Sequence, residues 1–315
     1  MSDVRLGIVG AGKIAQEHLK VIQAMNGVRV DGITSRTISK AEELAKTFFV
    51  DNVYENIDSL IEKCSLDALM ILVSANQIYD VTRKLIPANF PLFIEKPPGL
   101  VPEQTKTLVE LAQKHGTKNM VGYNRRYYSI FHKGIELINK NGGLLGLSIE
   151  GHERFWKIIE LDIPNEIREN WIFVNSTHTI DLLRLFGGEI VQINALVNRV
   201  KEKNGDQFTS SIKFNSGALG TYTSHWYSPG GWSVKLYGAG ISVKYGPLEK
   251  GVWINTDFNE FEINPDEVDV KYKPGFYEQL KSFITLIKSD KLDWPGQDLS
   301  DAYLTMSIAK EMIGS

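Results

Sequence analysis

A glycine-rich turn near the start of the chain constrains its fold more than any other feature. Residues 10–15 read G-A-G-K-I-A and follow directly on the apolar run 4–9. Strand, glycine turn and helix in this order are the context in which such a segment binds a dinucleotide. Gly10 permits the tight turn, Gly12 has no side chain to keep a pyrophosphate from the backbone, and Ala15 lets the helix pack close to the strand. The free N–H groups at the start of this helix would face the phosphates.

Length and charge narrow the class of protein. The 315-residue chain is too long for one ordinary core, so we expect domains at residues 1–122 and 123–315, with the last helices able to pack back on the first. A net charge of −3 argues against nucleic acid or a membrane surface as a partner. The single cysteine, Cys64, excludes an internal disulfide and a Cys-rich zinc site, and we expect no metal. The sequence contains neither a signal-peptide pattern nor a membrane-spanning apolar run, so we expect a cytoplasmic protein.

Hydrophobic periodicity divides the chain into two parts. Up to about residue 122, strand-like and helix-like runs alternate, which is typical of a parallel sheet covered on both faces. The expected strands are 4–9, 28–34, 68–73, 92–94 and 119–121, and the expected helices are 13–25, 39–47, 57–63, 78–86 and 102–115. In the helix at 39–47, we expect Ser39 as the N-cap and Glu42 as its capping-box partner.

After residue 122, several strands alternate apolar and polar residues, which indicates a mainly antiparallel sheet with one open face. Expected strands are 147–153, 190–198, 207–214, 218–226, 233–237 and 241–245, and expected helices are 131–139, 177–186, 276–288 and 299–312. A second G-A-G, at 238–240, has no helix after it and predicts a hairpin turn. The predicted fold class is α/β: a doubly wound parallel sheet, then an α+β domain with a large open-faced sheet.

A lysine stands where such sheets bind their ligands. Lys96 follows the predicted strand 92–94 and precedes two prolines, so it lies at the carboxyl edge of the parallel sheet. The E-K-P element at 95–97 accompanies V-S-A-N at 73–76, V-G-Y-N-R-R at 121–126 and H-T-I-D-L-L at 178–183. With the glycine turn, these segments make the chain resemble the family of glucose–fructose oxidoreductase, inositol dehydrogenase and the rhizopine-catabolism protein (Gfo/Idh/MocA). The resemblance covers nearly the whole chain and is specific for the family but not for the substrate.

The resemblance implies a Rossmann domain and a nicotinamide-dependent dehydrogenase acting on sugars, sugar derivatives or cyclitols. It also implies that Lys96 contacts the reacting oxygen and the nicotinamide ribose, and that His178 donates or accepts the proton. Chemistry agrees, because hydride leaves a carbon only as its hydroxyl proton is removed, and an imidazole is suited to that proton. An ammonium beside the oxygen would stabilise the developing alkoxide.

One position departs from the family pattern. Many members carry an aspartate four residues before the histidine, and here that residue is Val174. The neighbouring Asn175 is neutral and cannot raise the proton affinity of the histidine as a carboxylate would. Either the proton relay runs through His178 and Lys96 alone, or another group substitutes. Asp181, one helical turn on, could orient His178 or contact substrate, or it could only complement the helix start.

The end of the second predicted strand indicates which dinucleotide is bound. An acidic side chain there binds the adenine ribose 2′-hydroxyl and selects NAD, whereas a basic one accommodates the 2′-phosphate of NADP. Ser35 stands at the position that would be acidic, Arg36 follows it, and Asp31 lies mid-strand, out of reach. Charge-assisted bonds from Arg36 would favour NADP by roughly ten- to a hundredfold. We expect NADP(H) over NAD(H); the alternative is a solvated Arg36 and use of both.

The other candidate residues flank these elements. Expected cofactor-binding residues are Gly10, Gly12, Lys13, Ile14, Ser35, Arg36, Val73, Ser74, Asn76, Glu95, Lys96 and Asn124. Expected substrate-binding residues are Lys96, Arg126, His152, Arg168, Asn175, His178 and Asp181. Of Arg125 and Arg126, at least one is expected to be structural and to pair with carboxylates between the domains.

The open sheet predicts a homodimer or homotetramer, because its exposed face is expected to be rich in tyrosine and tryptophan. These residues are Tyr222, Trp226, Tyr227, Trp232 and Tyr237. The leading hypothesis is an oxidoreductase for a carbohydrate-like substrate. The alternatives are a reductase of the same fold for a non-sugar ligand, such as a dihydrodiol or a tetrapyrrole, and a cofactor-sensing regulator without turnover.

Overall fold

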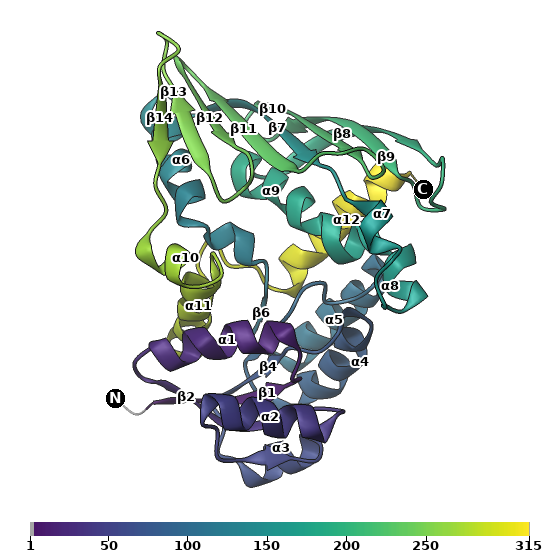
Figure 1. Ribbon diagram of the computed structural model, residues 1–315, viewed down its shortest axis with the longest axis vertical. Coiled ribbons are helices and arrows are strands. Elements are labelled where there is room, and N and C mark those ends of the chain that lie inside the picture. Colours follow the sequence, from purple (N-terminus) through teal and green to yellow (C-terminus); the bar gives the residue numbers. More distant parts are fainter. Residues whose placement is uncertain (1–2, 315) are drawn as a thin grey trace. The chain divides into compact units, whose positions relative to one another are not determined.

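The computed structural model describes residues 3–314, which divide into two compact units (Figure 1). The first unit contains residues 3–124 and 271–303, and the second contains residues 125–270 and 304–314. Each unit is built on its own sheet. Among the described residues, no helix has the length and apolar character needed to cross a membrane.

The first unit contains a six-stranded parallel sheet in the order β3-β2-β1-β4-β5-β6, which confirms the predicted doubly wound sheet. Its strands are β1 (Val4–Val9), β2 (Val28–Thr34), β3 (Val53–Tyr54), β4 (Ala68–Ile71), β5 (Leu92–Ile94) and β6 (Asn119–Val121). Every residue of β4 and β5 is buried, so both faces of the sheet are covered. Strand β3 was not predicted, because two residues carry no periodicity.

Helices flank this sheet, with α1 against α2 and α11, and α4 against α5 (Figure 1). They are α1 (Lys13–Ala24), α2 (Ile38–Phe48), α3 (Ile57–Lys63), α4 (Ala75–Leu85), the short 3-10 turn η1 (Ile86–Ala88), α5 (Pro102–His115) and α11 (Phe276–Ser289). Helix α12 (Leu299–Ile313) begins in the first unit and ends in the second.

The predicted start of α2 is wrong. The helix begins at Ile38, and its N-cap residue Thr37 makes no side-chain cap hydrogen bond. The chain enters the helix directly from the turn after β2, so Ser39 is already inside the first turn. The capping box of Ser39 and Glu42 therefore does not exist.

The second unit contains an eight-stranded sheet in the order β14-β13-β12-β11-β7-β10-β9-β8. Its strands are β7 (Leu144–Gly151), β8 (Ile190–Asn198), β9 (Gln207–Phe214), β10 (Leu219–His225), β11 (Trp232–Gly238), β12 (Ile241–Tyr245), β13 (Gly251–Ile254) and β14 (Glu260–Ile263). All neighbours are antiparallel except β7 and β10, as the predicted mainly antiparallel sheet requires. The predicted hairpin at residues 238–240 is confirmed as the link between β11 and β12.

Helices of the second unit pack on one face of this sheet, chiefly α9 and α6 (Figure 1). The helical segments are η2 (Asn124–Tyr127), α6 (Ser129–Lys140), α7 (Phe155–Ile158), α8 (Asn165–Glu169), the π-helical turn η3 (Ile172–Ser176), α9 (Thr177–Gly187) and α10 (Glu267–Lys271). Alternate residues of β9 and β10 are buried in the core, and the others are partly or fully exposed.

Two of the aromatic residues predicted on the open face lie on the covered side instead. Tyr222 and Trp226 are 1% and 3% exposed and belong to the core of the unit. The alternation of β10 turns Tyr222 inward, where its hydroxyl contacts Thr179, and burial raises the pKa of this hydroxyl. The exposed positions of β8, β9 and β10 carry mainly Ser, Thr, Asn, Gln and Lys, so the open face is more polar than predicted.

The glycine turn generates a stability prediction. Gly10 has a φ of +117°, and a Cβ built on it would lie 2.4 Å from the carbonyl oxygen of Leu72. A Cβ on Gly12 would meet nothing within 4 Å. Gly10→Ala should lower the free energy of unfolding by about 1–3 kcal/mol or more, because φ is strained and backbone atoms clash.

Gly12→Ala is the matched control and should stay within about 0.5 kcal/mol of the wild type. Urea unfolding of the apo-protein followed by circular dichroism measures both variants. Equal stability of the two variants would contradict the close approach of Gly10 to Leu72.

Candidate functional site

Hydrogen bonds on two sides fix the glycine turn at the carboxyl edge of the first sheet. The amide of Gly10 donates to the carbonyl of Thr34 at 2.8 Å, and the amide of Leu72 donates to the carbonyl of Val9 at 2.8 Å. The ends of β1, β2 and β4 are therefore held together. Helix α1 begins beyond Gly12, which leaves open space in front of its first turn. This is the arrangement in which helix N–H groups bind a phosphate.

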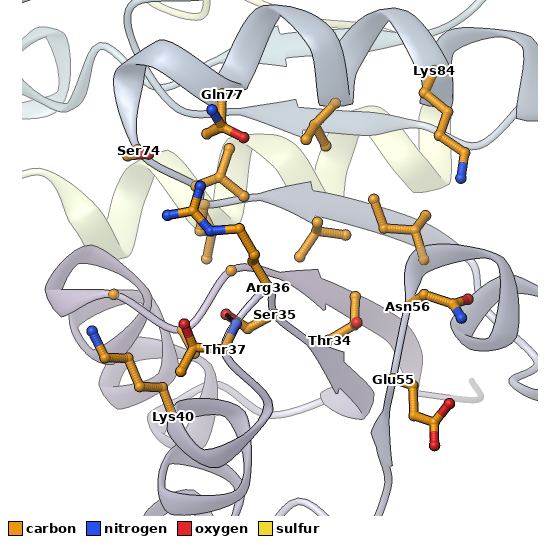
Figure 2. Close-up of a pocket in the computed structure, with 18 residues that line it drawn as sticks. Thr34, Ser35, Arg36, Thr37, Lys40, Glu55, Asn56, Ser74, Gln77 and Lys84 are labelled. Carbon is orange, nitrogen blue, oxygen red and sulfur yellow. Dashed lines mark hydrogen bonds between the residues drawn. The ribbon is translucent and has the colours of Figure 1, made fainter. Parts of the chain in front are cut away.

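A cavity of about 490 Å³ lies beside this turn (Figure 2). Six predicted cofactor-binding residues line it: Gly10, Gly12, Ser35, Arg36, Val73 and Ser74. They come from the ends of β1, β2 and β4, three neighbouring strands of the sheet. The residues fit a dinucleotide, since the backbone is accessible at Gly12 and polar side chains follow β2.

Cations outnumber anions in the lining of this cavity. Arg36, Lys40 and Lys84 line it together with one acidic residue, Glu55. In Figure 2, Arg36 extends toward the side of Ser74 and Gln77, whereas Glu55 lies at the opposite side of the view. Lys84 pairs with Asp58 at 2.7 Å. Asp31 pairs with Arg29 at 2.6 Å and is not part of the lining.

The other cofactor candidates lie outside this lining. Lys13 and Ile14 form the start of α1. Asn76 accepts a hydrogen bond from the Ser74 hydroxyl at 2.9 Å, and the buried Asn124 amide donates to the carbonyl of Pro274 at 3.0 Å. The buried carboxylate of Glu95 bonds the ring of His18.

Lys96 comes two residues after the end of β5 and is half-buried. Its backbone amide donates to the Glu95 carboxylate at 3.1 Å. The carboxyl edge of β5 belongs to the same sheet edge as the glycine turn. The structure of the first unit thus contains a cavity beside the glycine turn, with Lys96 after a strand that ends at the same edge of the sheet.

In the second unit, His178 lies in the first turn of α9 directly after the π-helical turn η3. It is 6% exposed, and its ring centroid lies 6.0 Å from that of Trp232. The guanidinium of Arg125 lies 4.5 Å from the Trp232 ring centroid. Burial lowers the pKa of Arg125, and the nearby Tyr128, Glu249 and Glu153 oppose this shift.

A second cavity, of about 720 Å³, is lined entirely by residues of the second unit. Two tryptophans, Trp171 and Trp232, supply aromatic surface. The polar lining residues include Glu150, His152, Glu153, Arg154, Asn175 and Glu249. Aromatic faces beside carboxylate and amide groups can pack against a sugar ring and bond its hydroxyls.

A carboxylate stands close to the position of the missing aspartate. Glu153 accepts hydrogen bonds from the Asn175 amide at 3.0 and 3.1 Å and from the Ser176 hydroxyl at 2.8 Å. Val174 is buried within η3. Glu153 therefore binds the two residues that immediately precede α9, the helix that carries His178.

The remaining substrate candidates differ in their surroundings. His152 lines the second cavity and stacks on His225, with ring centroids 5.6 Å apart. Burial is the main cause that lowers the pKa of His152, and Glu150 opposes it. Arg168 does not line the cavity; its guanidinium donates to Asn165 and to the carbonyl of Leu161.

Arg126 and Asp181 form a buried ion pair. Their closest atoms are 3.1 Å apart, and the two side chains are 7% and 1% exposed. The same carboxylate accepts a hydrogen bond from the hydroxyl of Thr305 in α12 at 3.0 Å. Arg126 thus pairs with a carboxylate, but both residues belong to the second unit, so this pair is not one between the domains as expected.

Sequence reasoning missed several residues of these sites. Lys40 was not singled out because it lies inside α2, one turn beyond the predicted specificity residues. Trp232 was assigned to the open face, and Glu153 was taken only as the end of a strand. The available signal for Glu153 was its position in the alternation of the strand, where it continues the inward-facing residues 147, 149 and 151.

Family models match both units. A model described as "Oxidoreductase family, NAD-binding Rossmann fold" matches residues 4–123, and the "GFO/IDH/MocA C-terminal domain" model matches residues 168–244. Together they cover more than half of the chain. The fold and the glycine-turn cavity define an NAD-binding oxidoreductase. The chain belongs to the Gfo/Idh/MocA oxidoreductase family.

Individual relatives are distant. The scyllo-inositol 2-dehydrogenase (NAD(+)) of Bacillus subtilis is 24% identical over 306 residues, covering 91% of this chain and 87% of that protein. The myo-inositol 2-dehydrogenase of Thermotoga maritima is 24% identical over 309 residues, covering 91% and 89%. A putative NADPH-dependent oxidoreductase from Desulfitobacterium hafniense has a similar structure, with a TM-score of 0.85, 13% identity and coverage of 99% and 95%.

The buried pair of Arg126 and Asp181 generates a second prediction. Asp181→Ala should lower the free energy of unfolding by about 3–5 kcal/mol, because it leaves the Arg126 guanidinium buried without its carboxylate. Urea unfolding measures the loss. Glu278→Ala, which breaks the exposed pair of Glu278 and Lys281, is the control and should cost less than about 1 kcal/mol. A similar small loss for both would mean that Asp181 does not stabilise the unit.

Proposed function

We propose that this protein transfers a hydride between a nicotinamide dinucleotide and a CH–OH or C=O group of a sugar, a sugar derivative or a cyclitol. The observation that carries the proposal is the cavity at the glycine turn, with Lys96 on the same sheet edge. The names of the distant relatives support the substrate class, since two of them are inositol dehydrogenases.

The chemistry requires a group that handles the hydroxyl proton. A bound nicotinamide supplies the acceptor for the hydride, which leaves the carbon with its electron pair. We assign the proton to His178, because an imidazole can take up and release a proton near neutral pH. Lys96 is assigned to the reacting oxygen, where its ammonium stabilises the negative charge that develops. Asp181 is assigned a structural role, since its carboxylate bonds Arg126 and Thr305.

The cavity of the second unit supports a polyhydroxylated substrate. Its tryptophans offer flat apolar surface, and Glu153, Asn175 and His152 offer hydrogen-bonding atoms. A ring that carries several hydroxyl groups presents both an apolar face and a polar edge, and this lining matches both. We propose Asn175 and His152 as substrate-binding residues.

We propose NADP(H) as the preferred cofactor. Arg36 and Lys40 both line the cavity, as does Ser35. No acidic residue of β2 is part of this lining. A 2′-phosphate carries about two negative charges and is bound well by such cations, whereas a free 2′-hydroxyl gains less from them.

We also propose a homodimer or homotetramer that assembles through the open face of the second sheet. This face carries small polar side chains, together with Leu196 and Leu219, which are 77% and 63% exposed. An open sheet face of this kind is suited to pairing with a second copy.

Two substitutions test the catalytic assignments. Lys96→Met should abolish turnover of a sugar and cyclitol panel while leaving NADPH binding, measured by fluorescence titration, within about threefold. His178→Ala should lower the rate by roughly a hundredfold or more. Lys106→Met, on an exposed pair with Glu110, is the control and should leave both unchanged.

Unchanged rates for Lys96→Met would remove Lys96 from the mechanism, and an effect below about threefold for His178→Ala would make that residue structural. If the protein binds NADPH but turns over no sugar, cyclitol, nucleotide sugar, dihydrodiol or tetrapyrrole, the result contradicts the proposed enzyme activity. It would favour a cofactor-sensing regulator without turnover.

A further pair of substitutions tests the cofactor preference. Ser35→Asp with Arg36→Ala should shift the ratio of NADPH to NADH affinity toward NADH by about ten- to a hundredfold, because it removes a cation and adds a carboxylate for the 2′-hydroxyl. Fluorescence titration with both nucleotides measures the ratio. No shift would show that the 2′-phosphate is bound elsewhere.

A further inference from the structure

A buried histidine and a buried glutamate meet inside the first unit. His18 on α1 is 1% exposed, Glu95 after β5 is 6% exposed, and His18 Nε2 lies 2.9 Å from Glu95 Oε1. As a carboxylate, Glu95 can only accept, so we describe Nε2–H as the donor. Buried polar groups are costly unless they are hydrogen-bonded, so this contact must offset the burial of both side chains.

The second oxygen of Glu95 acts on Lys96. The backbone amide of Lys96 donates to Glu95 Oε2 at 3.1 Å. A single carboxylate therefore bonds the ring of His18 with one oxygen and the amide of Lys96 with the other. The bond from His18 holds the carboxylate in one orientation. In that orientation, the other carboxylate oxygen can accept the hydrogen bond from the Lys96 amide.

Two phenyl rings pack against the histidine of this contact. The ring of His18 lies edge-on to Phe93, with centroids 5.0 Å apart, and 4.7 Å from the ring of Phe276. At Gly122, a Cβ would lie 3.3 Å from Cδ of Glu95, so the absence of a side chain there leaves room for the carboxylate. Because both side chains are buried, each hydrogen bond restrains its partners more than it would at the surface.

The contact also joins two functional elements. Helix α1 begins at the glycine turn, where the phosphates are expected, and His18 lies in the same helix. Glu95 directly precedes Lys96. We propose that His18 is a positioning residue that acts through Glu95: it fixes the backbone at Lys96 relative to α1, and so fixes the lysine relative to the cofactor. This inference rests on the proposed role of Lys96.

The first experiment measures the restraint without substrate or cofactor. In protein labelled with ¹⁵N-lysine, the Lys96 amide is identified by the loss of its signal in Lys96→Arg, and its hydrogen exchange is followed by NMR. His18→Leu should speed this exchange by about tenfold or more, because the carboxylate loses the bond that orients it. His18→Gln, whose amide nitrogen can reach the position of Nε2, should restore slow exchange.

A double variant covers the case in which His18→Leu does not fold because Glu95 is left buried without a partner. His18→Leu with Glu95→Leu replaces both polar groups by apolar ones, which suits the phenyl rings around them, but leaves the Lys96 amide without its acceptor. It should fold and show fast exchange at Lys96. Ile22→Val, on a buried position of α1 that does not bond Glu95, is the control for a packing change and should leave the exchange unchanged.

The second experiment measures catalysis with the sugar or cyclitol that the wild type turns over fastest. His18→Leu and the double variant should lower kcat by about tenfold or more, with KM and the NADPH dissociation constant within about threefold, and His18→Gln should recover most of the rate. Unchanged Lys96 exchange in both His18→Leu and the double variant would overturn the proposal. Faster exchange with unchanged kcat would also overturn it.

The experiments separate a failure of the proposed function from a failure of the role proposed for His18. If Lys96→Met retains turnover, the role of Lys96 is wrong, yet the exchange measurement still decides whether His18 restrains its backbone. If Ile22→Val speeds the exchange as much as His18→Leu does, the effect comes from loosened packing of α1, and the proposal is overturned.

Discussion

The hydrogen bonds on both sides of the glycine turn are the interaction on which the rest of the first unit depends. Gly10 bonds the end of β2, and Leu72, beyond β4, bonds the end of β1. Only a residue without a Cβ can make the turn, because the carbonyl of Leu72 occupies the place of that atom. The same closeness brings the residues after β2 and β4 to one cavity. The close approach of Gly10 to Leu72 therefore fixes both the junction of these three strands and the position of the cavity beside them.

Much of the fold could be predicted from the sequence. Most parallel strands are short, mainly apolar runs separated by helical periods, and the second sheet shows period-two alternation, so the parallel and the mainly antiparallel sheet were both predicted in type. Strands β13 and β14 and the short helices α7 and α8 were missed, because four or five residues carry too little periodicity. Tyr222 was misplaced because a strand's alternation tells which residues share a face, not which face is covered.

The candidate site was predictable where its residues are contiguous in the sequence. The glycine turn, Ser35 and Arg36 follow a fixed strand–turn–helix order, and they do line one cavity. Other parts depend on contacts between distant residues. His18 and Glu95 are 77 positions apart, and Glu153 bonds Asn175 across 22 positions, so no local pattern reveals either contact. Lys40 also lines the cavity, from the first turn of α2, and no motif in the sequence singles it out.

The most direct test of the account is a crystal structure of the protein grown with NADPH. The account predicts the pyrophosphate over the turn at Gly10 and Gly12, and the 2′-phosphate against Ser35 and Arg36. A nucleotide bound away from this turn, or a 2′-phosphate that makes no contact with Arg36, would contradict it.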